Sequence, residues 1–245
     1  MTPRSDSHMT TKLEGFDGKV VFFGLQGVIK WFLQDLWNEK FFQKPLSEVM
    51  NKYYHRMTTS LGPGMDISHI QALWELGYLP IEIVALPEGT KVPMKVPILT
   101  IKNTVPEFFW IVNYLETALS CELWKVSTVA TIAAQYRELV DSYAEETSDS
   151  TWFADYQCHD FSFRGMPGVY DASQSSAGHL LSFFGTDTIP AIDYVENYYG
   201  AAECEGLIFS SVSAGEHATC THNILNIKRD LEETGEWNGI KMEDL

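Results

Sequence analysis

Two apolar stretches in the second half of the chain each lead into a polar tip and then into a helical pattern, and a third polar tip lies ahead of them. The first tip is the segment 159–165, and the other two follow the apolar runs 180–184 and 207–209. A repeated order of strand, tip and helix is typical of an alternating α/β fold, in which the tips gather at the carboxyl ends of parallel strands and bind ligands. We therefore expect the segments 159–165, 185–188 and 211–217 to form one site.

The first 150 residues predict a mixture of strands and helices instead of strict alternation. Short β-prone runs bounded by turn residues predict the strands, and three-to-four spacing of apolar residues predicts the helices. The expected strands are 20–23, 81–86 and 96–101, the last two paired, and the expected helices are 25–33, 45–57, 67–76, 108–121 and 127–146. Asp66 is expected to cap the third helix and Gly77 to end it. The polar stretch 146–150 then predicts a domain boundary.

The remaining elements are expected to alternate. A helix should end near His179, a strand should run through Phe184, and a second helix should cover 190–199 before a strand that reaches Phe209. The tail from Asn223 predicts one polar helix broken at Gly235. We expect an α/β protein with a mixed α+β domain over residues 1–150 and an incomplete, barrel-like α/β domain over residues 151–245.

Composition excludes several classes of function. The formal net charge is −16, which argues against nucleic acid as a partner because phosphate backbones normally meet a basic face. No apolar run of about 18 residues exists to span a bilayer. The 4 cysteines form no CxxC pair and no secretory leader is evident, so we expect reduced thiols and a cytoplasmic protein. Walker, GxGxxG, HExxH and GxSxG motifs do not occur.

Six short motifs follow one another in an order and spacing that resemble a known family. They are Phe22–Gln26, Leu86–Gly89, Asn113–Thr117, His159–Gly165, Gly185–Thr188 and the pair Glu216 and His217. Together they resemble the nicotinamide phosphoribosyltransferases. The resemblance implies a type II phosphoribosyltransferase fold, a homodimer, and transfer of phosphoribosyl from phosphoribosyl pyrophosphate to nicotinamide, giving nicotinamide mononucleotide and pyrophosphate in NAD salvage.

Three residues are candidates for substrate binding. An aromatic ring such as Phe161 can stack on the pyridine ring of nicotinamide, or can pack in the core. The guanidinium of Arg164 presents a planar fork of donors to phosphate oxygens, or can form a salt bridge in this acidic chain. Asp187 can accept a hydrogen bond from the carboxamide and repel nicotinic acid, or can cap the helix that starts at Pro190. The resemblance favours the substrate role at each position.

The histidines carry the remaining predictions for the site. The resemblance implies that His217 is catalytic, contacts pyrophosphate, and becomes phosphorylated when ATP hydrolysis is coupled to the transfer; without the resemblance a structural role is favoured. His159 is expected to line the same pocket and His179 to be packed, while Asp160 can hold the backbone of its own turn. A zinc site at His217, Cys220 and His222 is disfavoured for lack of a fourth ligand, so we expect no protein-held metal and Mg²⁺ brought by the pyrophosphate.

The resemblance extends from the start of the chain to about His217. It corresponds to the amino-terminal half of a full-length member, so we expect an incomplete chain that lacks a preceding segment and a carboxyl-terminal half. An alternative is therefore a catalytically incomplete fragment that acts as a dimerising or binding module. A weaker alternative is a transferase specific for nicotinic acid.

Overall fold

The computed structural model describes residues 17–203 and 208–241. The chain divides into two compact units, Met1–Ser210 and Ser211–Leu245, and each is described by itself below. The expected change of domain near residue 150 falls inside the first unit and stays a prediction. The expectations for residues 1–16 and for Leu207 lie outside the described residues.

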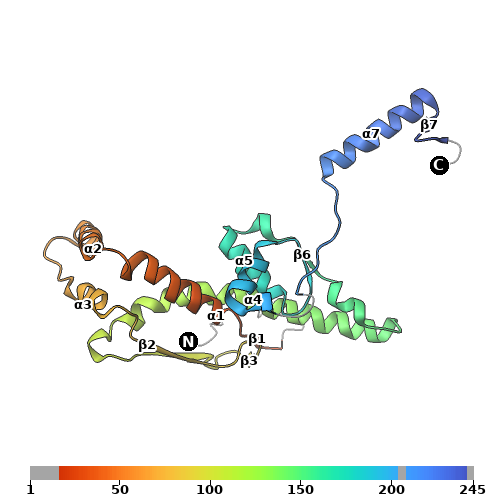
Figure 1. The fold of residues 1–245 in the computed structure, drawn as a ribbon. Helices are drawn as coiled ribbons and strands as arrows, with labels where there is room; N and C mark the ends of the chain where they lie inside the picture. Colours follow the sequence, from red (N-terminus) through yellow and green to blue (C-terminus); the bar gives the residue numbers. More distant parts are fainter. Residues whose placement is uncertain (1–16, 204–207, 242–245) are drawn as a thin grey trace. The chain divides into compact units, whose positions relative to one another are not determined.

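The first unit combines short strands with helices (Figure 1). In chain order its elements are β1 (Lys19–Val21), α1 (Leu25–Val28), the π-helical η2 (Ile29–Leu36) and η3 (Asn38–Phe42), α2 (Leu46–Leu61), α3 (Ser68–Leu76), β2 (Ile81–Ala85), β3 (Lys91–Pro93), β4 (Leu99–Asn103), the 3₁₀ turn η4 (Pro106–Phe108), α4 (Ile111–Thr147), the 3₁₀ turn η5 (Trp152–Tyr156), β5 (His159–Asp160), the 3₁₀ turn η6 (Phe163–Gly165), α5 (Val169–His179), β6 (Gly185–Thr186), α6 (Pro190–Tyr199) and the 3₁₀ turn η7 (Ala201–Glu203).

The strands of the amino-terminal part form two antiparallel pairs. β1 pairs with β3, and β2 pairs with β4 in a register that sets Ile83 opposite Ile101. The expected pairing of 81–86 with 96–101 is therefore confirmed, although β4 begins only at Leu99, two residues after Pro97. Proline lacks the N–H that a ladder position would need, which accounts for the late start.

The chain between Leu25 and Phe42 forms one continuous helical stretch that is longer than expected. It begins as α-helix and continues through the π-helical turns η2 and η3, where we expected an end near Leu33. π-helical turns are rare and are frequent at functional sites. Gly24, with φ of 106°, precedes this stretch in the left-handed region that favours glycine.

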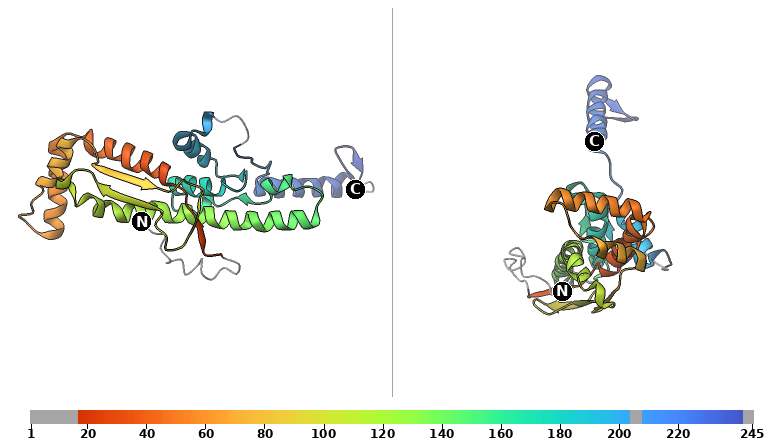
Figure 2. Two further views of the ribbon diagram at one scale, coloured as in Figure 1. Left: turned by 90° about the horizontal axis from the view of Figure 1, so that it is seen from below. Right: turned by 90° about the vertical axis from the view of Figure 1, so that its left-hand side faces the viewer.

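α4 is one helix of 37 residues, so the prediction of two helices at 108–121 and 127–146 is wrong. No glycine or proline interrupts the chain from Ile111 to Thr147, and a buried stripe runs on through Leu119, Leu123 and Val126 across the expected break. Figure 2 shows α4 running alongside the strands. Its first half packs against Phe22 and Val28 in one core cluster, and its second half packs in another cluster with α5 and α6.

β5 and β6 form a parallel pair in the carboxyl-terminal part of the first unit. Ser210 extends this arrangement by a single parallel bridge to Gly185. The expected strand 180–184 is wrong, because Phe183 N bonds to the carbonyl of His179 and the segment ends α5 as a turn. A short buried apolar run does not distinguish strand from helix end by its pattern alone. The helices expected to end at His179 and to span 190–199 are confirmed as α5 and α6.

The second unit consists of α7 (His217–Thr234) and a hairpin of β7 (Glu236–Trp237) with β8 (Ile240–Lys241). Gly235 ends α7 with φ of 75°, as its place in the sequence predicted. The helix begins at His217, at the end of the expected tip 211–217, and continues through the tail from Asn223. The carboxylate of Glu216 accepts a hydrogen bond from Thr219 N at 2.9 Å and caps the helix. None of the helices in the described ranges is long and apolar enough to cross a membrane.

Candidate active site at the ends of two parallel strands

The candidate site is built where β5 and β6 end side by side. The parallel register sets His159 opposite Gly185 and Asp160 opposite Thr186. Phe161 and Asp187 are the next residues on each strand, so both emerge at the same carboxyl edge. The first two predicted tips are therefore brought together by the structure.

The carboxylate of Asp160 connects these two strand ends. Its Oδ1 accepts a hydrogen bond from Ser162 N at 3.0 Å, and its Oδ2 accepts from the hydroxyls of Thr186 at 3.1 Å and Thr188 at 2.8 Å. The expectation that Asp160 holds its own turn is confirmed, but its bonds to the other strand were not foreseen. Burial raises the pKa of Asp160, yet hydrogen bonds led by those from Ser162, Ser176 and Thr188 outweigh burial and hold this pKa well below its usual range.

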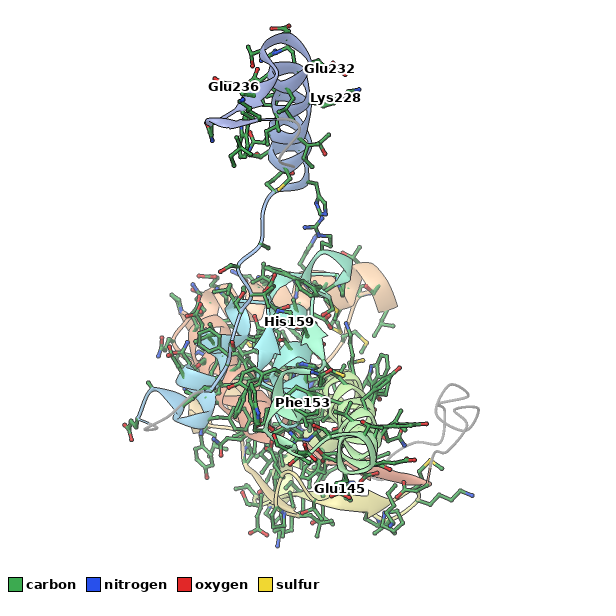
Figure 3. The ribbon with its side chains drawn as sticks, turned by 90° about the vertical axis from the view of Figure 1, so that its right-hand side faces the viewer. Glu145, Phe153, His159, Lys228, Glu232 and Glu236 are labelled. Carbon is green, nitrogen blue, oxygen red and sulfur yellow. The ribbon has the colours of Figure 1, made fainter. Side chains whose placement is uncertain are left out.

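His159 and Asp187 form a hydrogen-bonded pair across the two strands. His159 Nε2 lies 2.8 Å from Asp187 Oδ1, and the side chains are 15% and 33% exposed. An ionised carboxylate only accepts hydrogen bonds, so Nε2 carries the proton. Figure 3 labels His159 within the first unit. The pair fixes the direction of the Asp187 carboxylate.

Phe161 stands at an open cavity of about 400 Å³. Its side chain is 59% exposed, which excludes core packing, and its ring centroid lies 4.4 Å from that of His159 with an interplanar angle of 34°. The cavity is lined by Val129, Ile132, Ala133, Tyr136, Cys158, His159, Asp160, Phe161, Ser162, Met166, Ser175, His179 and Phe183. A wall that is mostly apolar with a few polar groups is typical of a site for a small aromatic ligand.

Arg164 lies in the 3₁₀ turn η6, which follows Phe161, and it is exposed. Within residues 17–203 and 208–241 its guanidinium forms no ion pair. The alternative of a structural salt bridge therefore finds no support in the described chain. Arg164 is not among the residues that line the cavity, although Ser162 and Met166 on either side of it are. An exposed fork of donors is chemically suited to a phosphate group.

His217 is the first residue of α7 in the second unit, where it is exposed, and it is described there alone. Its neighbour Glu216 caps the helix through Thr219. This capping bond gives Glu216 a structural role at the start of α7. In the described residues no group of three or more His, Cys, Asp or Glu side chains is placed to hold a metal ion.

Sequence reasoning missed the contribution of α4 to the cavity. Val129, Ala133 and Tyr136 recur at helical spacing and form one wall. Their pattern in the sequence is that of any core-facing stripe, so it carried no signal of a site. His179, expected to be packed, is partly buried and bonds through Nε2 to the carbonyl of Gly185 at 3.0 Å; burial lowers its pKa, which favours the neutral ring.

Comparison with known proteins finds similar sequences. The chain is 54% identical over 218 residues to the nicotinamide phosphoribosyltransferase of Acinetobacter baylyi, a match that covers 89% of this chain and 42% of that protein. The sequence resemblance is confirmed. The enzyme of the same name from Xanthomonas campestris is 36% identical over 146 residues, or 59% of this chain and 30% of that protein. A scan against family models finds no match.

A solved structure shares the fold. The crystal structure of human nicotinic acid phosphoribosyltransferase matches 84% of this chain and 33% of its own chain, with a TM-score of 0.51 and 20% identity. This likeness supports the expected α/β fold class. The chain spans less than half the length of the curated relatives it matches.

Proposed function

We propose that this chain supplies the nicotinamide-binding part of a nicotinamide phosphoribosyltransferase. The enzyme would be a pentosyltransferase that forms nicotinamide mononucleotide and pyrophosphate. The observation that carries the proposal is the emergence of Phe161 and Asp187 from adjacent parallel strands, one bearing an exposed ring at a cavity and the other an oriented carboxylate. A flat aromatic amide needs both of these groups.

The ring and the amide of nicotinamide would be recognised separately. Phe161 stacks on the pyridine ring, an aromatic contact worth about 1 kcal/mol beyond burial. Asp187, held by His159, accepts a hydrogen bond from the carboxamide NH₂. Nicotinic acid would bring a second carboxylate toward Asp187 and be repelled, which selects the amide over the acid.

The phosphate side of the reaction would use the two remaining candidates. Arg164 has no ion pair in the described chain and binds phosphate oxygens of phosphoribosyl pyrophosphate. His217 contacts the departing pyrophosphate and takes up phosphate when ATP hydrolysis is coupled to the transfer. Mg²⁺ would accompany phosphoribosyl pyrophosphate as part of the substrate.

The enzyme is proposed to act as a homodimer in the cytoplasm. A second candidate is a non-catalytic binding or dimerising module. The two candidates differ in turnover but share the nicotinamide pocket.

Binding of nicotinamide by the purified chain tests the pocket without requiring turnover. In a calorimetric titration, Phe161→Ala should weaken binding by about fivefold or more because it removes the stacking surface. Phe163→Ala is the matched control, since Phe163 lies two residues away, is 36% exposed and is absent from the cavity wall. Equal effects of both substitutions, or no effect of Phe161→Ala, would exclude the proposed pocket.

Formation of nicotinamide mononucleotide then separates the two candidates. Product from nicotinamide and Mg²⁺–phosphoribosyl pyrophosphate that is lost in His217→Ala would establish the transferase. Nicotinamide binding without product would favour the binding fragment.

A further inference from the structure

A second cavity in the first unit combines positive charge with aromatic surface. It has a volume of about 450 Å³ and lies among the helical stretch η2–η3, α2, α3 and the start of α4. Its lining residues are Trp37, Lys40, Phe41, Lys44, Glu48, Val49, Lys52, Tyr53, Arg56, Ile70, Trp110 and Tyr114. None of them lines the cavity at Phe161. Tyr114 and Val129, which belong to the two different cavities, are separated by about 22 Å along α4.

The charge of this cavity is opposite to that of the chain. Four cations and one carboxylate line it, whereas the whole chain carries −16. Lys40 is paired with Glu39. Among the residues that the structure describes, Lys44, Lys52 and Arg56 have no ion-pair partner despite the excess of carboxylates. Unpaired cations around one concavity focus a positive potential that attracts anions.

The sequence places these cations on one side of a helix. Lys52 and Arg56 are four residues apart in α2, and Glu48 lies four residues before Lys52, so the three side chains form one stripe. Lys44 lies two residues before the start of α2, and its carbonyl accepts a hydrogen bond from the indole of Trp74 at 2.9 Å. The backbone that carries Lys44 is thereby held at the cavity.

The aromatic part of the wall is ordered by its own contacts. Trp110 packs edge-on against Tyr114, with ring centroids 5.0 Å apart. The hydroxyls of Tyr53 and Tyr114 lie 3.4 Å apart. Burial and the Tyr114 hydroxyl raise the pKa of Tyr53 to about 12, so this phenol keeps its proton at neutral pH and can donate to an oxygen. Aromatic faces next to Arg and Lys can take a flat base by stacking while the cations take phosphates.

We propose that this cavity, the Lys52–Trp110 cavity, is a second ligand site that binds a nucleotide. Lys44, Lys52 and Arg56 bind the phosphates, Glu48 can accept from ribose hydroxyls, and Trp37 or Trp110 contacts the base. The volume lies within the range of sites for ligands of this size. This inference does not depend on the proposed transferase activity.

Binding of ADP to the purified chain tests the proposal. Calorimetry should show saturable binding that Lys52→Gln/Arg56→Gln weakens by about tenfold or more, because two charge-assisted contacts are lost. The control Lys19→Gln/Lys102→Gln removes the same charge from exposed cations paired with Asp17 and Glu82 and should change affinity by less than about twofold. No binding, or equal loss in both double variants, overturns the proposal.

Two further arms identify the ligand and the site. ADP should bind about tenfold tighter than either pyrophosphate or adenosine, since only ADP uses both the cations and the aromatic wall. If pyrophosphate bound as tightly as ADP, the cavity would be a general anion site and the proposal of a nucleotide site would be refuted. Arg164→Gln should leave ADP affinity unchanged. Loss of ADP binding in Arg164→Gln alone would assign the nucleotide to the Phe161 cavity and overturn the inference, without bearing on nicotinamide binding there.

Discussion

His159 and Asp187 lie 2.8 Å apart, Nε2 to Oδ1, although 28 positions separate them in the sequence. The contact exists because His159 is in β5 and Asp187 directly follows β6, and these strands are parallel neighbours. The bond from His159 fixes the orientation of the Asp187 carboxylate, and both residues are candidates for substrate binding. The same two strand ends also share the carboxylate of Asp160.

The His159–Asp187 pair should show measurable coupling in a double-mutant cycle on the free energy of unfolding. His159→Ala, Asp187→Ala and the double variant are expected to give a coupling of about 0.5–1 kcal/mol, because the pair is only partly buried. Urea unfolding at pH 7 measures it. Additive effects of the two substitutions would mean that the pair does not form in solution.

Asp160 should make the stability of the first unit depend on acidity. Its pKa is lowered in the folded state, so its contribution is present above the unfolded value of about 4 and is lost as pH falls from there toward the lower folded value. Asp160→Asn should cost about 2 kcal/mol at pH 7 and much less near pH 2. Urea unfolding between pH 2 and 7 checks this. Asp149→Asn changes an exposed loop residue and is the control, so its free energy of unfolding should depend on pH as that of the unmodified chain does. A cost of Asp160→Asn that does not change with pH would contradict the lowered pKa of Asp160.

Gly185 should not tolerate a methyl group. A Cβ at this position would lie 2.6 Å from His159 Nδ1 and 3.1 Å from the carbonyl oxygen of Cys158. Gly185→Ala should therefore lower the free energy of unfolding by about 2 kcal/mol and disturb the His159–Asp187 pair. At Gly168, where the backbone is extended and no atom lies within 4 Å of the added Cβ, alanine should change it by less than about 0.5 kcal/mol. Thermal unfolding measures the stability of both variants. Equal stabilities would refute the close approach of Gly185 to His159 and Cys158.

The sequence predicted those parts of the fold that local chemistry determines. α2, α5 and α6 and the pairing of β2 with β4 follow from glycine, proline and apolar spacing near their ends. The full length of α4 was not predicted, because two helices were expected in its place. Helix growth is cooperative, so the helix continues where no glycine or proline interrupts the chain. The turn at 180–184 was missed because an apolar segment buried against a core has no distinctive period.

The candidate site, like the fold, was predicted where neighbouring residues determine it and missed where residues distant in the sequence do. The tips after β5 and β6 were expected to meet because parallel strands end at one edge, and Asp160 was expected to bind its own turn. The bonds from Thr186 and Thr188 to Asp160 depend on residues 26 and 28 positions away. The wall formed by α4 likewise depends on residues that are distant in the sequence. No local pattern reports such contacts.

The partly buried carboxylate of Glu88 should be important for the stability of the first unit. Its carboxylate accepts from Gly24 N at 2.8 Å, from Gln26 N at 2.6 Å and from the hydroxyl of Tyr199 at 2.9 Å, so it joins the start of α1 to the end of α6. Burial, with the charge of Glu88, raises the pKa of Tyr199 above its ordinary value, so the phenol remains a donor.

Glu88→Ala should therefore lower the free energy of unfolding by about 2–3 kcal/mol, since it leaves two backbone donors and a partly buried hydroxyl without their acceptor. Tyr199→Phe should cost about 1 kcal/mol, and the double variant less than the sum, because the two side chains share one bond. Glu82→Ala, which removes an exposed carboxylate paired with Lys102, should cost less than about 0.5 kcal/mol. Urea unfolding followed by tryptophan fluorescence measures the free energy of unfolding of all four variants. If Glu88→Ala cost no more than Glu82→Ala, the hydrogen bonds to Glu88 would not form in solution.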